Sequence, residues 1–249
     1  MARQLLAKLI LEIPDFDKRL EKGDLELVNI IARNIGAVNM FSFASKYCTY
    51  HNAISIHHAV ELVIALALIS VLGKLLDLDF YFQLGDRKKG IKYLSIFTAT
   101  LALISVALHT LMALSNQLPV YTFPLDGRNI IGTLGFSLLL SGPMEEIVFR
   151  ALPVTLLTYA FGKSIEIKGS FTLEVILASI LFAFAHASWS IAPLHFEADY
   201  FQLIYAFAMG TVQGIVYQKT KSILYPVLMH SFSNVLMVGG GYVFTALFS

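Results

Sequence analysis

Long apolar stretches separated by short polar segments are the dominant pattern along the chain. A helix of about 20 predominantly apolar residues crosses a hydrocarbon core about 30 Å thick. The pattern predicts membrane-spanning helices at residues 27–46, 58–76, 92–115, 129–161, 172–188, 200–218 and 222–247. The predicted fold class is therefore all-α: a polytopic transmembrane helical bundle of about seven spans, within a range of six to eight.

Two of the predicted spans are irregular. Residues 27–46 are interrupted by Arg33 and several asparagines, which makes this span the weakest. The segment 129–161 is longer than one membrane crossing requires, so it must tilt, kink at Pro143 or Pro153, or split into two helices.

The pattern indicates one transmembrane domain, at residues 27–249, because no linker, low-complexity tract or internal repeat divides it. Residues 1–26 are predicted to be a cytosolic or membrane-surface segment, since their apolar positions can share one helical face. Their apolar run is too short for a secretory signal.

Composition supports the membrane assignment, because 57% of the 249 residues are apolar and only 14% are charged. The mean hydropathy is +0.70. A net charge of +1, without a basic cluster interleaved with aromatic residues, argues against a nucleic-acid partner. The single cysteine, Cys48, excludes an intrachain disulfide and a thiolate metal site.

The placement of Lys and Arg predicts the orientation, because cytoplasmic loops are enriched in both. We predict that the N-terminus is cytoplasmic and the C-terminus is outside, because this orientation places only Lys46 and Arg128 on the outer side. The cytoplasmic segments then contain Arg3, Lys8, Lys18, Arg19, Lys22, Arg87, Lys88, Lys89, Lys92, Lys163, Lys168, Lys219 and Lys221.

Ionisable side chains within apolar spans are costly and usually mark function. Glu146 and Arg150 are four residues apart on one predicted helix, which suits an ion pair. Glu145 points about 100° away and has no such partner in its own segment. Its charge must therefore be balanced by a group on another helix, or its carboxyl must stay protonated.

Two other spans supply polar groups: His186 follows Phe182 by one helical turn, and Asn234 follows His230 by one turn. Counted from the cytoplasmic ends of the spans, Glu145, His186 and His230 lie at depths of roughly 24, 21 and 12 Å. The shallow value for His230 would be corrected if residues 221–225 entered the membrane as extended chain, with the helix starting near Pro226.

These groups suit hydrolysis of a peptide bond by an activated water. A carboxylate beside an imidazole can act as a general base, which suggests Glu145 with His186. His230 and Asn234 could donate hydrogen bonds to the oxyanion that forms as water adds to the amide. No G-x-S-x-G segment and no pair of aspartates in separate spans supports a serine or aspartyl mechanism.

Three short motifs carry a family resemblance. They are "EEIVFR" (145–150), "FAFAH" (182–186) and "HSFSN" (230–234). They lie on the fourth, fifth and seventh predicted helices. In sequence and order they resemble the motifs of the CPBP intramembrane protease family, which includes the CAAX prenyl proteases. The resemblance covers about residues 83–238 and is the strongest in the C-terminal part.

The resemblance implies an intramembrane glutamic endopeptidase without a cofactor or metal, acting on a membrane-associated peptide or protein that can carry a C-terminal prenyl group. Glu145 would be the general base, assisted by His186, with His230 and Asn234 as the oxyanion hole. Glu146 and Arg150 would support the shape of the site. Lipid is the other expected partner, and the sequence leaves the oligomeric state open.

Two alternatives stay open at this stage. The chain could be a non-hydrolytic protein of the same fold, such as a self-immunity or regulatory protein. It could also be a metalloprotease in which Glu145, His186 and His230 bind zinc. The other histidines are interpreted as structural or solvated; these are His51, His57 and His58 near a loop, His109 alone in its span, and His195 in a loop.

Overall fold

The computed structural model describes residues 50–121, 123–191 and 194–248, and most of these residues are helical. The elements are α5 (Tyr50–Leu76), α6 (Arg87–Leu114), α7 (Gly127–Phe136), η1 (Ser137–Ser141), α8 (Gly142–Glu146), η2 (Ile147–Ala151), α9 (Leu152–Ala160), β1 (Glu166–Lys168), β2 (Phe171–Thr172), α10 (Leu173–Ala185), β3 (Ser188–Ile191), β4 (Leu194–Glu197), α11 (Tyr200–Thr220) and α12 (Leu224–Phe248).

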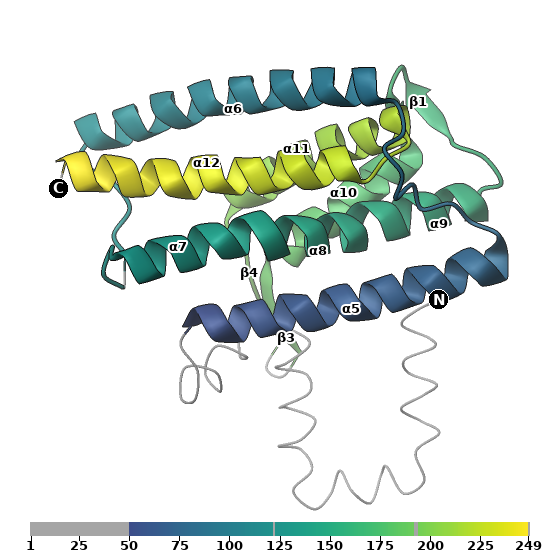
Figure 1. Ribbon diagram of the computed structural model, residues 1–249, viewed down its shortest axis with the longest axis horizontal. Helices are drawn as coiled ribbons and strands as arrows, with labels where there is room; N and C mark the ends of the chain where they lie inside the picture. The colour runs from purple at the N-terminus through teal and green to yellow at the C-terminus, as the bar shows by residue number, and fades with distance from the viewer. Residues whose placement is uncertain (1–49, 122, 192–193, 249) are drawn as a thin grey trace, which may run out of the picture.

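The helices form a bundle with their axes along its longest dimension (Figure 1). Helix α12 packs against α6 on one side and against α8 on the other, and α5 packs on α8 in turn. Helices α10 and α11 pair with each other, and α11 also contacts α12. Glu145 and Glu146 therefore lie on a helix that is bordered by α5 and α12.

Within the part of the chain that the structure describes, three helices are long and apolar enough to cross a membrane: Ser55–Leu76, Arg87–Leu114 and Leu224–Phe248. They coincide with three predicted spans, so the chain is a helical membrane protein as expected. Helix α10 is apolar but shorter. The spans predicted at 129–161 and 200–218 fall on helices, but their crossing of the membrane stays a prediction, and so does the total of about seven. The span at 27–46 and the segment 1–26 lie outside the described residues.

Among the described residues, two antiparallel hairpins interrupt an otherwise all-α architecture, and the sequence pattern did not predict them. Strand β1 pairs with β2 directly before α10, and β3 pairs with β4 between α10 and α11. The β1–β2 hairpin is held to the bundle at Glu174, which is fully buried and accepts hydrogen bonds from Ser164 Oγ and Gln218 Nε2. The start of α10 is thereby tied to the end of α11.

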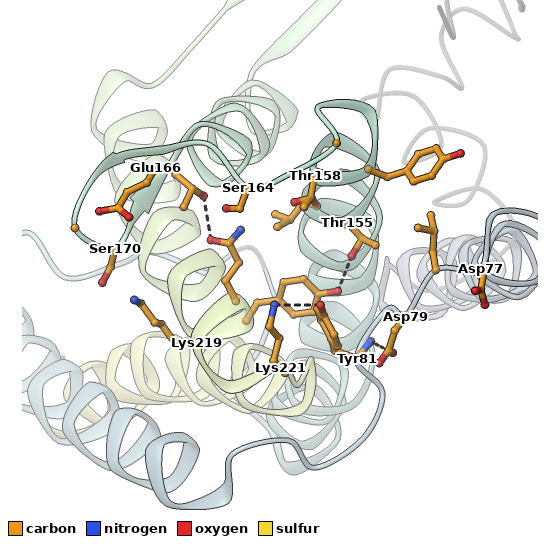
Figure 2. Close-up of a pocket in the computed structure, with 18 residues that line it drawn as sticks. Asp77, Asp79, Tyr81, Thr155, Thr158, Ser164, Glu166, Ser170, Lys219 and Lys221 are labelled. Atoms are coloured by element: carbon orange, nitrogen blue, oxygen red, sulfur yellow. Dashed lines mark hydrogen bonds between the residues drawn. The ribbon is translucent and has the colours of Figure 1, made fainter.

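The α5–α6, α9–α10 and α11–α12 connections border a cavity of about 720 Å³, whose lining includes Asp79, Tyr81, Ser164, Lys219 and Lys221. Figure 2 shows this cavity, with the ammonium of Lys221 donating to the hydroxyl of Tyr81 at 3.1 Å. Which side of the membrane this end faces stays a prediction.

Candidate active site

The helix that carries the two glutamates is continuous from Gly127 to Ala160 but widens into a π-helical turn on each side of α8. Pro143 and Pro153 each lie just after one of these turns. Proline has no backbone N–H and its ring crowds the preceding turn, so a wider turn relieves the clash. The expected irregularity at both prolines is therefore present as two π turns rather than as a split helix.

Helix α12 supplies the hydrogen bond that Pro143 cannot donate. The Leu138 carbonyl, five residues before Pro143, accepts a hydrogen bond from Ser231 Oγ at 2.9 Å. The two helices touch closely here, since a Cβ on Gly142 would lie 2.2 Å from Ser231 Oγ and 3.0 Å from Ser231 N. This contact fixes α8 against the part of α12 that carries His230.

Glu146 and Arg150 form a buried charge pair, as the spacing predicts. Both side chains are 0% exposed, and Arg150 Nε lies 3.2 Å from Glu146 Oε2. Arg150 Nη2 also donates a hydrogen bond of 2.8 Å to Gln213 Oε1 on α11. The guanidinium carbon lies 3.9 Å from the centroid of the Phe182 ring on α10, in cation–π geometry. Arg150 thus connects three helices.

His230 bridges the two carboxylates from α12. Its Nδ1 lies 2.7 Å from Glu146 Oε1 and its Nε2 lies 3.7 Å from Glu145 Oε2. A carboxylate oxygen only accepts, so Nδ1–H donates to Glu146. Glu146 thereby orients the ring with Nε2 towards Glu145.

Glu145 is held from its own helix and from two others. Ser141 Oγ donates a hydrogen bond of 2.8 Å to Glu145 Oε1. Asn234 Nδ2 donates to Ser141 Oγ at 3.2 Å, so Asn234 reaches Glu145 through this hydroxyl. His58 Nε2 on α5 lies 3.8 Å from the same Oε1. The side chain of Glu145 is 17% exposed, which leaves it accessible.

His186 lies at the end of α10 and contacts Phe182 rather than Glu145. Its Nδ1 is 2.9 Å from the Phe182 carbonyl, to which it donates, so Nε2 is the nitrogen with a free lone pair in the neutral ring. The Phe182 ring packs edge-on against His186 and His230, with centroid distances of 4.6 and 5.9 Å. The Phe182 ring therefore contacts both imidazoles.

Three polar neighbours of the site were not identified from the sequence. His58 was interpreted as lying near a loop with a structural or solvated role, which is wrong in position: it is on α5, with a side chain only 13% exposed. Ser141 could have been found, because it precedes Glu145 by one helical turn. Gln213 is a polar residue in a largely apolar helix, which was the available signal for it.

Among residues 55–248, excluding the masked positions, no group of three or more His, Cys, Asp or Glu side chains is arranged to hold a metal ion. His109 is buried on α6, where its ring packs on Phe244 and its Nδ1 bonds the Ser105 carbonyl at 2.7 Å. These contacts agree with its interpretation as a structural residue, which stays a prediction. His195 and His51 lie where no side chain is described.

A comparison with known protein families finds a match that includes the residues of this site. Residues 127–236 match the family model described as type II CAAX prenyl endopeptidase Rce1-like. This range includes Glu145, His186, His230 and Asn234, and the match confirms the resemblance of this part of the chain to the CPBP and CAAX protease family.

The comparisons outside this domain are narrower. Residues 1–55 match a family model described as an N-terminal domain. An uncharacterised protein of Haemophilus influenzae is 47% identical over 57 residues, which cover 20% of this chain and 26% of that protein. The chain therefore spans about a quarter of the length of that relative. No solved structure matches the chain.

Proposed function

We propose that this protein is an intramembrane glutamic endopeptidase that hydrolyses a peptide bond with a water activated by Glu145. The observation that carries the proposal is the meeting of the Glu145 carboxylate with His230 Nε2 at 3.7 Å, since the two residues come from different helices. The Rce1-like match over residues 127–236 supports the same reaction class.

Each side chain has a separate task in the proposed reaction. Glu145 Oε2 takes a proton from water, and His186 Nε2 accepts a second hydrogen bond from that water. The water oxygen then attacks the carbonyl carbon of the substrate amide. His230 Nε2–H and Asn234 Nδ2–H donate to the resulting oxyanion. The proton held by Glu145 passes to the leaving amine nitrogen as the C–N bond breaks.

Glu146 and Arg150 support this chemistry without touching the substrate. Glu146 accepts from His230 Nδ1 at 2.7 Å, which keeps the opposite nitrogen directed at the reacting oxygen. Arg150 neutralises Glu146 and is itself held by Gln213. Such fixed donors stabilise a transition state because they need no reorganisation during the reaction.

The proposed substrate is a membrane-associated peptide or protein with a C-terminal prenyl group, in line with the description of the matching family. The test uses purified protein in detergent with quenched C-terminal peptides, one farnesylated and one without a prenyl group. Faster cleavage of the farnesylated peptide is expected. Equal cleavage rates for the two peptides would contradict the prenyl specificity but not the proposed hydrolase activity. Failure to cleave either peptide would contradict the proposed function and favour a non-hydrolytic role.

A further inference from the structure

Helix α5 places an imidazole at the candidate active site from outside the two matched parts of the chain. His58 Nε2 lies 3.8 Å from Glu145 Oε1, and both side chains are largely buried, at 13% and 17% exposure. The family match covers 127–236 and the N-terminal match covers 1–55, so neither comparison includes His58.

The ring of His58 is oriented by a contact with the helix that carries Glu145. It packs edge-on against Phe136, the last residue of α7, with a centroid distance of 4.9 Å. Helix α5 also packs along α8 and both π turns. The packing of the ring thus directs Nε2 of His58 at the carboxylate.

The two oxygens of Glu145 have different surroundings as a result. Oε1 accepts from Ser141 Oγ at 2.8 Å and faces His58 Nε2, whereas Oε2 faces His230 Nε2. A carboxylate with one oxygen fixed by donors cannot rotate, so its other oxygen keeps one direction. Separations of 3.7 to 3.8 Å are longer than hydrogen bonds, and such contacts often shorten when substrate binds.

We propose that His58 is a positioning residue for the general base: with Ser141 it holds Oε1 of Glu145, so that Oε2 is the oxygen that takes the proton from water. This inference rests on the proposed hydrolase function. It gives α5, which precedes the Rce1-like domain, a direct part in assembling the site. His58 itself exchanges no proton with the substrate.

The neighbouring histidine provides a matched control. His57 is on the same helix but its Nε2 pairs with Glu61 Oε1 at 3.3 Å, four residues along α5. The side chains of His57 and Glu61 are more exposed, at 27% and 40%. The His57 ring also packs edge-on against His58, with a centroid distance of 5.5 Å. A leucine at position 57 therefore removes a ring that contacts His58 but removes no donor from Glu145.

The experiment compares kcat and KM for peptide cleavage by the parent protein and the variants His58→Leu, His58→Gln and His57→Leu, with thermal unfolding of each in detergent. Glutamine keeps an N–H donor near the place of Nε2, whereas leucine does not. His58→Leu is expected to lower kcat by roughly 10- to 100-fold with little change in KM, because misplacing a catalytic group by about 1 Å has an effect of that size. His58→Gln should recover most of kcat, and His57→Leu should match the parent.

Several results would overturn the inference. A parent-like kcat in His58→Leu would show that Glu145 needs no donor from α5. An equal loss in His58→Gln, or a loss of folding in both His58 variants, would make His58 a structural residue. An equal loss in His57→Leu would show a general effect of α5. If the parent protein cleaves no peptide, the proposed function is wrong and this inference is wrong with it. If the parent cleaves and the His58 variants give one of the results above, only this inference is wrong.

Discussion

Replacing Arg150 by methionine tests the buried charge network by removing the guanidinium that pairs with Glu146. The two charges are 3.2 Å apart and both side chains are 0% exposed. At an effective dielectric constant of about 20, unit charges at 3.2 Å attract each other by about 5 kcal/mol. Removing one partner of a buried pair costs about 3–5 kcal/mol, because the other charge stays buried without compensation. Arg150→Met is therefore expected to lower the free energy of unfolding by that amount.

The assay is equilibrium unfolding in detergent micelles, followed by circular dichroism, for Arg150→Met, Glu146→Gln and the double variant. The double variant should be less destabilised than the sum of the single variants by about 1–3 kcal/mol, since the second substitution removes the unpaired charge. Arg128→Met is the control, because Arg128 is exposed at the start of α7, and its effect should stay within about 0.5 kcal/mol. Additive effects of the two single substitutions would refute the argument from charge pairing.

Further predictions concern the helix contact and the chemistry. Gly142→Ala should lower the free energy of unfolding by about 1–3 kcal/mol, because its Cβ would lie 2.2 Å from Ser231 Oγ. Gly135→Ala, whose Cβ would meet nothing within 4 Å, should be neutral or slightly stabilising in the same measurement. Ser231→Ala should cost about 1 kcal/mol through the lost bond to the Leu138 carbonyl. Treatment with a metal chelator should leave the rate of peptide cleavage unchanged, whereas a loss that added zinc restores would indicate a metalloprotease.

The residue types of the site could be predicted because an ionisable residue is easily recognised within an apolar segment of the sequence. Glu145, His186 and His230 were selected for this reason, and the spacing of Glu146 and Arg150 gave their ion pair. The bond between His230 Nδ1 and Glu146 Oε1 could not be predicted, since it depends on how α12 is rotated against α8. The position of His58 beside Glu145 could not be predicted either, because it depends on how α5 packs against α8, and the sequence predicts only that His58 lies near a loop at the start of a span.

The correction proposed for the depth of His230, an extended entry of residues 221–225, is wrong for a geometric reason. Helix α12 already begins at Leu224, so residues 221–225 do not enter as extended chain. His230 is six residues into α12 and Glu146 is 14 residues from the end of α9, roughly 9 and 21 Å along the two helices. The two side chains are nevertheless 2.7 Å apart, so the helix ends lie at different levels. Counting from the ends of predicted spans assumes one common level.

The central claim is that the carboxylate of Glu145 activates the water that cleaves the peptide. The most direct measurement is the cleavage rate of a quenched peptide by Glu145→Gln, which retains the size of the side chain but removes the base. The control is Glu61→Gln, which changes an acid on α5 that pairs with His57 at 3.3 Å. The account predicts that Glu145→Gln unfolds at the parent temperature and cleaves at least 100-fold more slowly, on the order of a general-base contribution, while Glu61→Gln cleaves like the parent. Cleavage by Glu145→Gln at the parent rate would contradict it.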